Sequence, residues 1–146
     1  MKLFRWFAIL AALAAAAPGR ADLAAARAEP NLEKRSRKAL DNAAAALTAA
    51  EKAYRQGDLK HTQVLLAEVR ESVELAHESL QQTGKNPSRS PKHFKHAEIK
   101  TRELVRRMGD LREHMAIDDR EVVDQVRARV REIHDELLRG IMGKRR

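Results

Sequence analysis

The chain has 146 residues, of which 43% are hydrophobic but only 3% aromatic, and its formal net charge is +8. This length suits a single domain that can bury a core, and the shortage of aromatic residues argues against a sheet protein. The chain contains no cysteine, which excludes disulfides, thiolate metal sites and a lipid anchor on cysteine.

The first 21 residues have the pattern of a secretory signal peptide. Lys2 and Arg5 give a positive start, and twelve apolar residues follow at positions 6–17. This run is too short to span a bilayer, which takes about twenty residues. We expect cleavage after Ala21, with cleavage after Ala28 as the alternative. The mature protein should then lie in the periplasm or outside the cell, without a transmembrane segment.

Removal of residues 1–21 lowers the formal charge from +8 to +5, because Lys2, Arg5 and Arg20 leave and no acid does. A charge of this size is mild for a nucleic-acid-binding domain, and an exported protein meets little nucleic acid. We therefore expect no nucleic-acid partner.

Four segments have the periodicity of amphipathic helices, at about residues 30–56, 58–83, 91–116 and 119–142. In the second, apolar or small residues recur at alternating steps of three and four, which places them on one narrow stripe. The members of this stripe are Leu59, Thr62, Leu66, Val69, Val73, Ala76 and Leu80. The third and fourth segments have stripes of the same kind. A stripe this narrow needs partner helices.

The stripe of the first segment consists mostly of alanine. Such small residues allow two helix axes to approach closely, or they leave a groove that larger residues fill.

The turn that follows the first segment contains Gly57, which suits the end of a helix, and Asp58, which can cap the next one. Residues 53–59 resemble the inter-helix turn of tetratricopeptide repeats. No second copy appears at the required period of about 34 residues, so we interpret the segment as a helical hairpin.

The third segment is predicted to begin with Ser90 as its cap, and the fourth with the capping box of Asp118 and Glu121.

The predicted fold is all-α, an up-down-up-down four-helix bundle with coiled-coil-like heptad packing over residues 30–143. A frayed lead-in at 22–29 precedes it, and a basic tail at 144–146 follows. The alternative is a long two- or three-helix coiled coil that dimerises, so both a monomer and a homodimer are open.

A metal site is one hypothesis for function. The predicted topology brings His77, His93 and His134 to one pole, where they flank the helix seams, while His96 points further out. Glu74 and His77 have the Glu-x-x-His spacing of di-iron bundles, but no second copy of the spacing occurs. The hypothesis is therefore a zinc or copper site at the surface.

An exported four-helix bundle of this size resembles cytochrome b562 in outline. That family ligates haem with a methionine on the first helix and a histidine near the end of the fourth. His134 matches the second position, but the mature first helix has neither methionine nor histidine. We therefore expect no bound cofactor, and a periplasmic metal- or haem-binding bundle is the alternative function.

The last feature is a local excess of positive charge, a net +6 over residues 85–107. Five residues share the outer face of the third segment, and we call them the basic strip: Lys92, Lys95, Ile99, Arg102 and Arg106.

The chain shows no pattern of a nucleophile beside a base, so we do not expect an enzyme. The sequence favours a binding or structural module of the cell envelope. Its basic strip would dock on an anionic envelope surface or an acidic protein.

Overall fold

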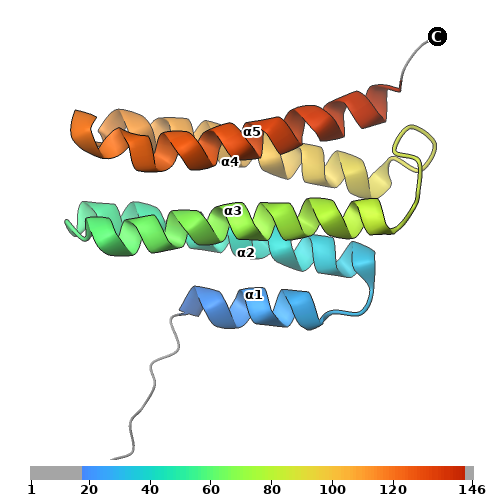
Figure 1. The fold of residues 1–146 in the computed structure, drawn as a ribbon, viewed down its shortest axis with the longest axis horizontal. Coiled ribbons are helices and arrows are strands. Elements are labelled where there is room, and N and C mark those ends of the chain that lie inside the picture. Colours follow the sequence, from blue (N-terminus) through green and yellow to red (C-terminus); the bar gives the residue numbers. More distant parts are fainter. Residues whose placement is uncertain (1–17, 144–146) are drawn as a thin grey trace, which may run out of the picture.

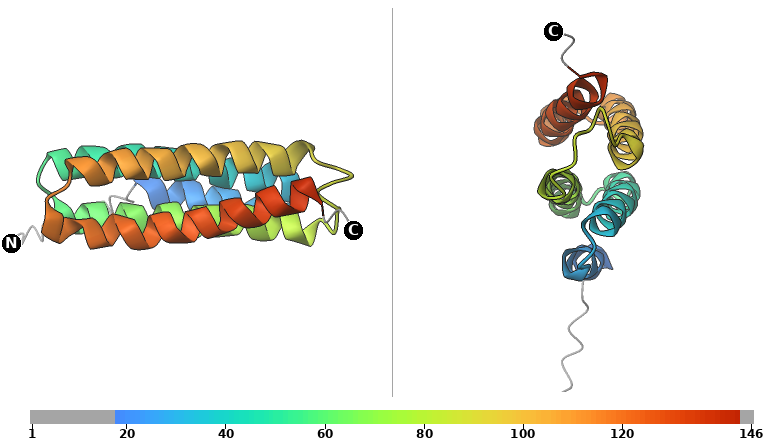
Figure 2. Two further views of the ribbon diagram at one scale, coloured as in Figure 1. Left: turned by 90° about the horizontal axis from the view of Figure 1, so that it is seen from above. Right: turned by 90° about the vertical axis from the view of Figure 1, so that its right-hand side faces the viewer.

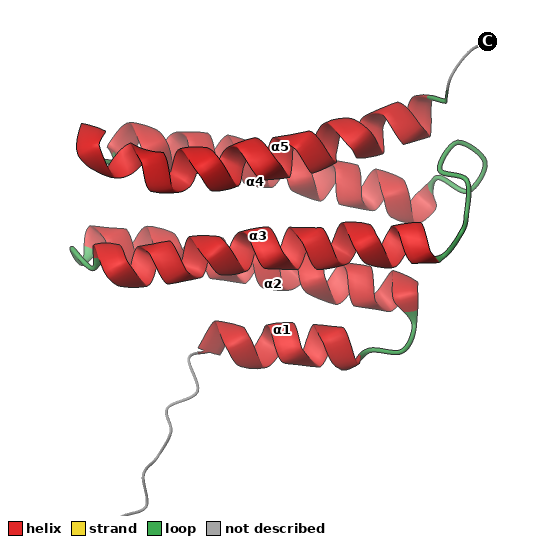
Figure 3. Ribbon diagram, viewed as in Figure 1, coloured by secondary structure: helices red, strands yellow, loops and turns green. Residues whose placement is uncertain are grey.

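The computed structural model describes residues 18–143, and it describes the side chains from residue 22 onward. This part of the chain is helical, without strands (Figure 3). The helices are α1 (Pro18–Ala28), α2 (Leu32–Arg55), α3 (Leu59–Gln82), α4 (Lys92–His114) and α5 (Arg120–Met142), with a short 3₁₀ helix, η1 (Ile117–Asp119), before α5. Residues 1–17 of the expected signal peptide and the basic tail at 144–146 lie outside the described residues.

The helices form three layers (Figures 1 and 2). The hairpin of α2 and α3 is the middle layer. The hairpin of α4 and α5 packs on one side of it, through contacts of α5 with α3 and of α4 with α2. Helix α1 packs on the other side and contacts both α2 and α3.

The presence of α1 corrects two expectations. The described chain has five packed helices rather than the four of the predicted bundle, and residues 22–28 are helical rather than a frayed lead-in. The physical reason is burial: Leu23 and Ala26 are only 4% and 0% exposed. The loop that follows is fixed to α2, because Arg35 donates a hydrogen bond to the Glu29 carbonyl and Lys38 pairs with the Glu29 carboxylate at 2.6 Å.

Helix boundaries follow local capping, which the sequence predicted only in part. Asp58 accepts a hydrogen bond from the backbone of His61, and Gly57 has a φ of +76°, so the predicted turn between α2 and α3 is confirmed. The predicted capping box of Asp118 is wrong, because η1 precedes α5 and no side chain caps α5. Ser90 does not cap α4 either, since Pro91 occupies the cap position there.

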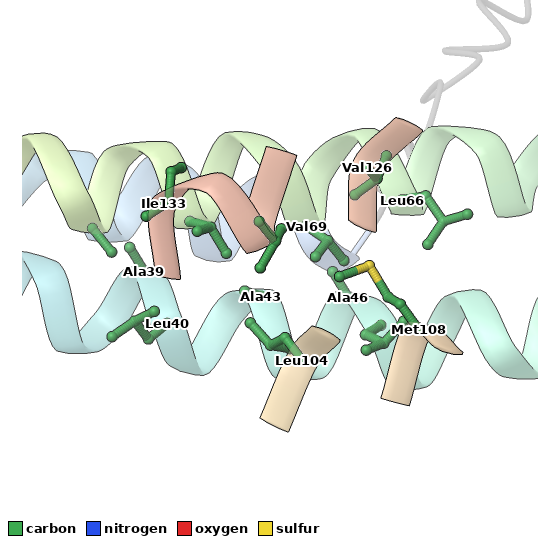
Figure 4. Close-up of a cluster of buried hydrophobic side chains, with 14 of the residues drawn as sticks. Ala39, Leu40, Ala43, Ala46, Leu66, Val69, Leu104, Met108, Val126 and Ile133 are labelled. Atoms are coloured by element: carbon green, nitrogen blue, oxygen red, sulfur yellow. The ribbon is translucent and has the colours of Figure 1, made fainter. Parts of the chain in front are cut away.

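The core joins the stripes of the four longer helices (Figure 4). Alanines of α2, among them Ala43 and Ala46, lie in one buried cluster with Leu104 and Met108 of α4. The small side chains of α2 therefore leave room for larger ones from α4. At about 25 cal/mol per Å² of buried apolar surface, this shared core is the main source of stability.

Helix α3 buries a second stripe beside the predicted one: Leu65, Glu68, Ser72 and Ser79. This side of the helix faces α2, because Asn42 of α2 donates a hydrogen bond to the Ser72 hydroxyl at 2.9 Å within the protein interior. Polar groups in such a place need partners, since an unpaired buried polar group costs about 1–3 kcal/mol. The middle hairpin thus combines apolar packing on one face with polar contacts on the next.

The stripe register can be tested with Val69→Asp. Val69 is fully buried, so the change would place a carboxylate among apolar side chains and should lower the free energy of unfolding by about 3 kcal/mol or more. Glu71→Ala is the control, because Glu71 is exposed and makes only a 3.8 Å ion pair with Arg27, which should contribute less than about 1 kcal/mol. Equal urea midpoints for the two variants would contradict this register.

Candidate functional site

All five residues of the basic strip lie at the surface of α4. Ile99 is 50% exposed, so the strip presents one large apolar side chain to solvent. The buried residues of the same helix explain why the strip faces outward. Phe94, Leu104 and Met108 bind α4 to the core, so the residues on the opposite side of the helix face solvent.

The cations of the strip differ in how they are paired. Arg102 lies 3.5 Å from Glu98, and Arg106 lies 3.2 Å from Asp110, each one helical turn away. Lys92 and Lys95 form no ion pair with any residue between 22 and 143. Exposed pairs of this kind contribute about 1 kcal/mol at most, so they would yield readily to a stronger anionic partner.

The three histidines of the metal hypothesis each pair with a glutamate from another helix, and His134 also lies 3.2 Å from its neighbour Asp135. His77 lies 3.4 Å from Glu136 and so links α3 to α5. His93 lies 2.9 Å from Glu33 and links α4 to α2. These two pairs connect the two hairpins.

The third pair lies within one hairpin, where His134 of α5 is 3.0 Å from Glu98 of α4. Sequence reasoning missed Glu33, Glu98 and Glu136 as partners, because each comes from a helix other than that of its histidine. No local spacing signals such a pair.

This arrangement does not bring His77, His93 and His134 together as the ligands of one metal. Each side chain lies at a different helix interface. Within residues 22–143 no group of three or more acidic or histidine side chains has the geometry to hold a metal ion. The Glu-x-x-His spacing also has another role here, because Glu74 accepts a hydrogen bond from Arg129 of α5 at 3.0 Å.

Burial changes the titration of two histidines. It lowers the pKa of His77, and Arg129 lowers it further, while Glu136 and Glu78 oppose the change. Burial also lowers the pKa of His96, together with the charges of Arg37 and Lys100. The folded protein therefore favours the neutral form of both side chains.

The pKa of the Glu33 carboxylate is also lowered, but here the folded protein favours the charged form. A hydrogen bond from Lys85 holds its pKa below the usual range, helped by the charge of His93. The contribution of Glu33 to stability is thus lost only in acid, as the pH falls through its lowered pKa.

Comparisons of the chain with protein-family models, with curated proteins and with solved structures find no match. None of the helices between residues 18 and 143 has a stretch that is both long and apolar enough to cross a membrane.

The two lowered histidine pKa values predict a pH dependence of stability. Just below the ordinary histidine pKa of 6.5, the unfolded chain binds protons that folded His77 and His96 do not, so the free energy of unfolding should fall as the pH decreases from 7 to 5. Urea unfolding at several pH values measures this slope.

The double variant His77→Gln, His96→Gln should flatten that slope. His61→Gln is the control, since His61 is exposed at the start of α3 and should leave the slope unchanged. If the double variant keeps the full slope, other groups cause it.

Proposed function

We propose that this chain is an exported, non-catalytic helical protein that docks on an anionic surface of the cell envelope through its basic strip. The observation that carries the proposal is the exposure of all five strip residues on one helix. An acidic protein is the second kind of partner with the required charge. Both a monomer and a homodimer are compatible with this role.

The geometry of α4 supports such docking. A helix places residues three and four positions apart on one face, so the cations of Lys92, Lys95, Arg102 and Arg106 can meet a flat anionic surface together. Each cation near such a surface contributes about 1 kcal/mol, and the attraction is screened over about 8 Å at physiological salt. Ile99 adds a single apolar side chain that can enter the interface.

A non-catalytic role is supported by the hydrogen bonds of the polar side chains. A hydroxyl nucleophile is activated by a hydrogen bond to a base such as histidine. In the part of the chain that the structure describes, no serine or threonine hydroxyl forms such a hydrogen bond. The half-buried histidines His77, His93 and His134 pair with carboxylates instead.

For the mature protein we propose an up-down-up-down bundle of α2 to α5 with α1 as an added layer. Cleavage after Ala21 would keep Leu23 and Ala26 in their buried positions, whereas cleavage after Ala28 would remove both. The burial of these two side chains supports the first site. Location in the periplasm or outside the cell rests on the signal pattern of the sequence.

The test of docking is a charge reversal within the strip. Lys95→Glu, Arg102→Glu and Arg106→Glu together should weaken binding to anionic phospholipid vesicles by more than about a hundredfold, because three contributions of about 1 kcal/mol are lost. Co-sedimentation at low and physiological salt measures the binding, which should also weaken steeply with salt for the unaltered protein.

A second triple variant has the same net charge on another face. Lys52→Glu, Lys60→Glu and Arg70→Glu change exposed residues of α2 and α3 and should reduce binding far less. Equal losses in the two triple variants would mean that net charge acts without the strip. No binding of the unaltered protein at low salt would overturn the proposal.

A further inference from the structure

A second feature lies at the end of the molecule where α2 and α4 both terminate. There an open cleft of about 670 Å³ lies between the two helices. Tyr54 and Leu111 line it together with charged residues. Clefts that bind small molecules have volumes of about 300–1,000 Å³, so this one has room for a small ligand.

Two sets of hydrogen bonds fix the walls of the cleft. The Tyr54 hydroxyl donates to Asp119 at 3.0 Å and accepts from the backbone of Ala116 at 2.8 Å, which holds the ring in place. Arg107 reaches from α4 to α2, where it donates to the Thr48 hydroxyl at 2.9 Å and to Glu51 at 3.1 Å. A site with fixed walls spends less free energy on ordering when a ligand binds.

Among the charged residues that line the cleft, one cation has no ion pair within the described part of the chain. Glu51 pairs with Arg107, and Asp110 pairs with Arg106, so both acids of the cleft are neutralised. Arg55, in the last turn of α2, forms no ion pair with any residue between 22 and 143.

His114 adds a second polar group at the rim. Its Nδ1 donates to the Asp110 carbonyl at 2.8 Å, because a carbonyl oxygen can only accept. This hydrogen bond leaves Nε2 available, and in the protonated imidazole it would be another donor for an anion.

We propose that this cleft binds one small amphiphilic carboxylate. The hydrocarbon or aromatic body lies against Tyr54 and Leu111, and the carboxylate accepts hydrogen bonds from the guanidinium of Arg55. A planar guanidinium matches a carboxylate with two parallel hydrogen bonds, which a neutral or cationic ligand cannot form. The cleft shares only the ion pair of Arg106 and Asp110 with the basic strip, and ligand binding in it does not depend on vesicle docking.

The test uses the single tyrosine of the chain. Its ring lines the cleft, so the full chain labelled with ¹³C only in tyrosine reports binding there directly. Dodecanoate below its micelle concentration should shift the Tyr54 ring signals with saturation. Dodecyltrimethylammonium, which has the same tail and the opposite charge, should bind at least about tenfold more weakly.

Two variants locate the anion. Arg55→Glu should weaken dodecanoate binding by at least about tenfold, the effect of one lost charge-assisted hydrogen bond. Arg70→Glu changes an exposed arginine of α3 and should leave the dissociation constant unchanged. Circular dichroism melting would show that both variants fold.

The strip variant Lys92→Glu, Lys95→Glu separates this site from the proposed docking function. It should weaken vesicle binding and leave dodecanoate binding unchanged. Three results would each overturn the proposal: unshifted Tyr54 signals, equal affinity for the two detergents, or unaltered affinity in Arg55→Glu.

Discussion

The structure depends on the burial of α3 along two adjacent stripes. One stripe, with Leu66 and Val69, packs toward the α4–α5 hairpin, and the other, with Ser72, faces α2. A helix buried this widely has to lie in a middle layer. Its hairpin with α2 offers one face to α4 and α5 and leaves the other to α1, so both outer layers depend on it.

The same middle layer determines what the surface presents. Because α4 is fixed by its apolar stripe on the inner side, its cations are gathered on the outer side, and Glu98 is drawn toward His134 of α5. The interface between α2 and α4 ends in the cleft beside Tyr54, where small residues give way to charged ones. The proposed docking face and the proposed ligand site are thus two results of the same placement of α4.

Sequence patterns were sufficient where one helix alone determines the outcome. The alternating steps of three and four identified buried residues such as Val73, Leu104 and Ile133, and the same helical geometry identified the exposed strip. Patterns were insufficient for α1, because its alanines show no distinct stripe and its buried side chains are covered by other helices, α2 and α3. They were equally insufficient for the pairs of His77 and His93, and for the cleft, since these join residues more than thirty positions apart.

Native-state hydrogen exchange tests the central claim, that the α2–α3 hairpin is the layer on which the others pack. Amide protection increases with burial and with the cooperativity of the surrounding unit. Amides of α3, on the sides of both Leu66 and Ser72, should exchange most slowly, and amides of α4 and α5 should exchange faster. Amides of α1 should exchange fastest among the five helices, but still well below the rate of an unfolded chain. Slowest exchange in α4 and α5, or unprotected amides throughout α1, would contradict this account.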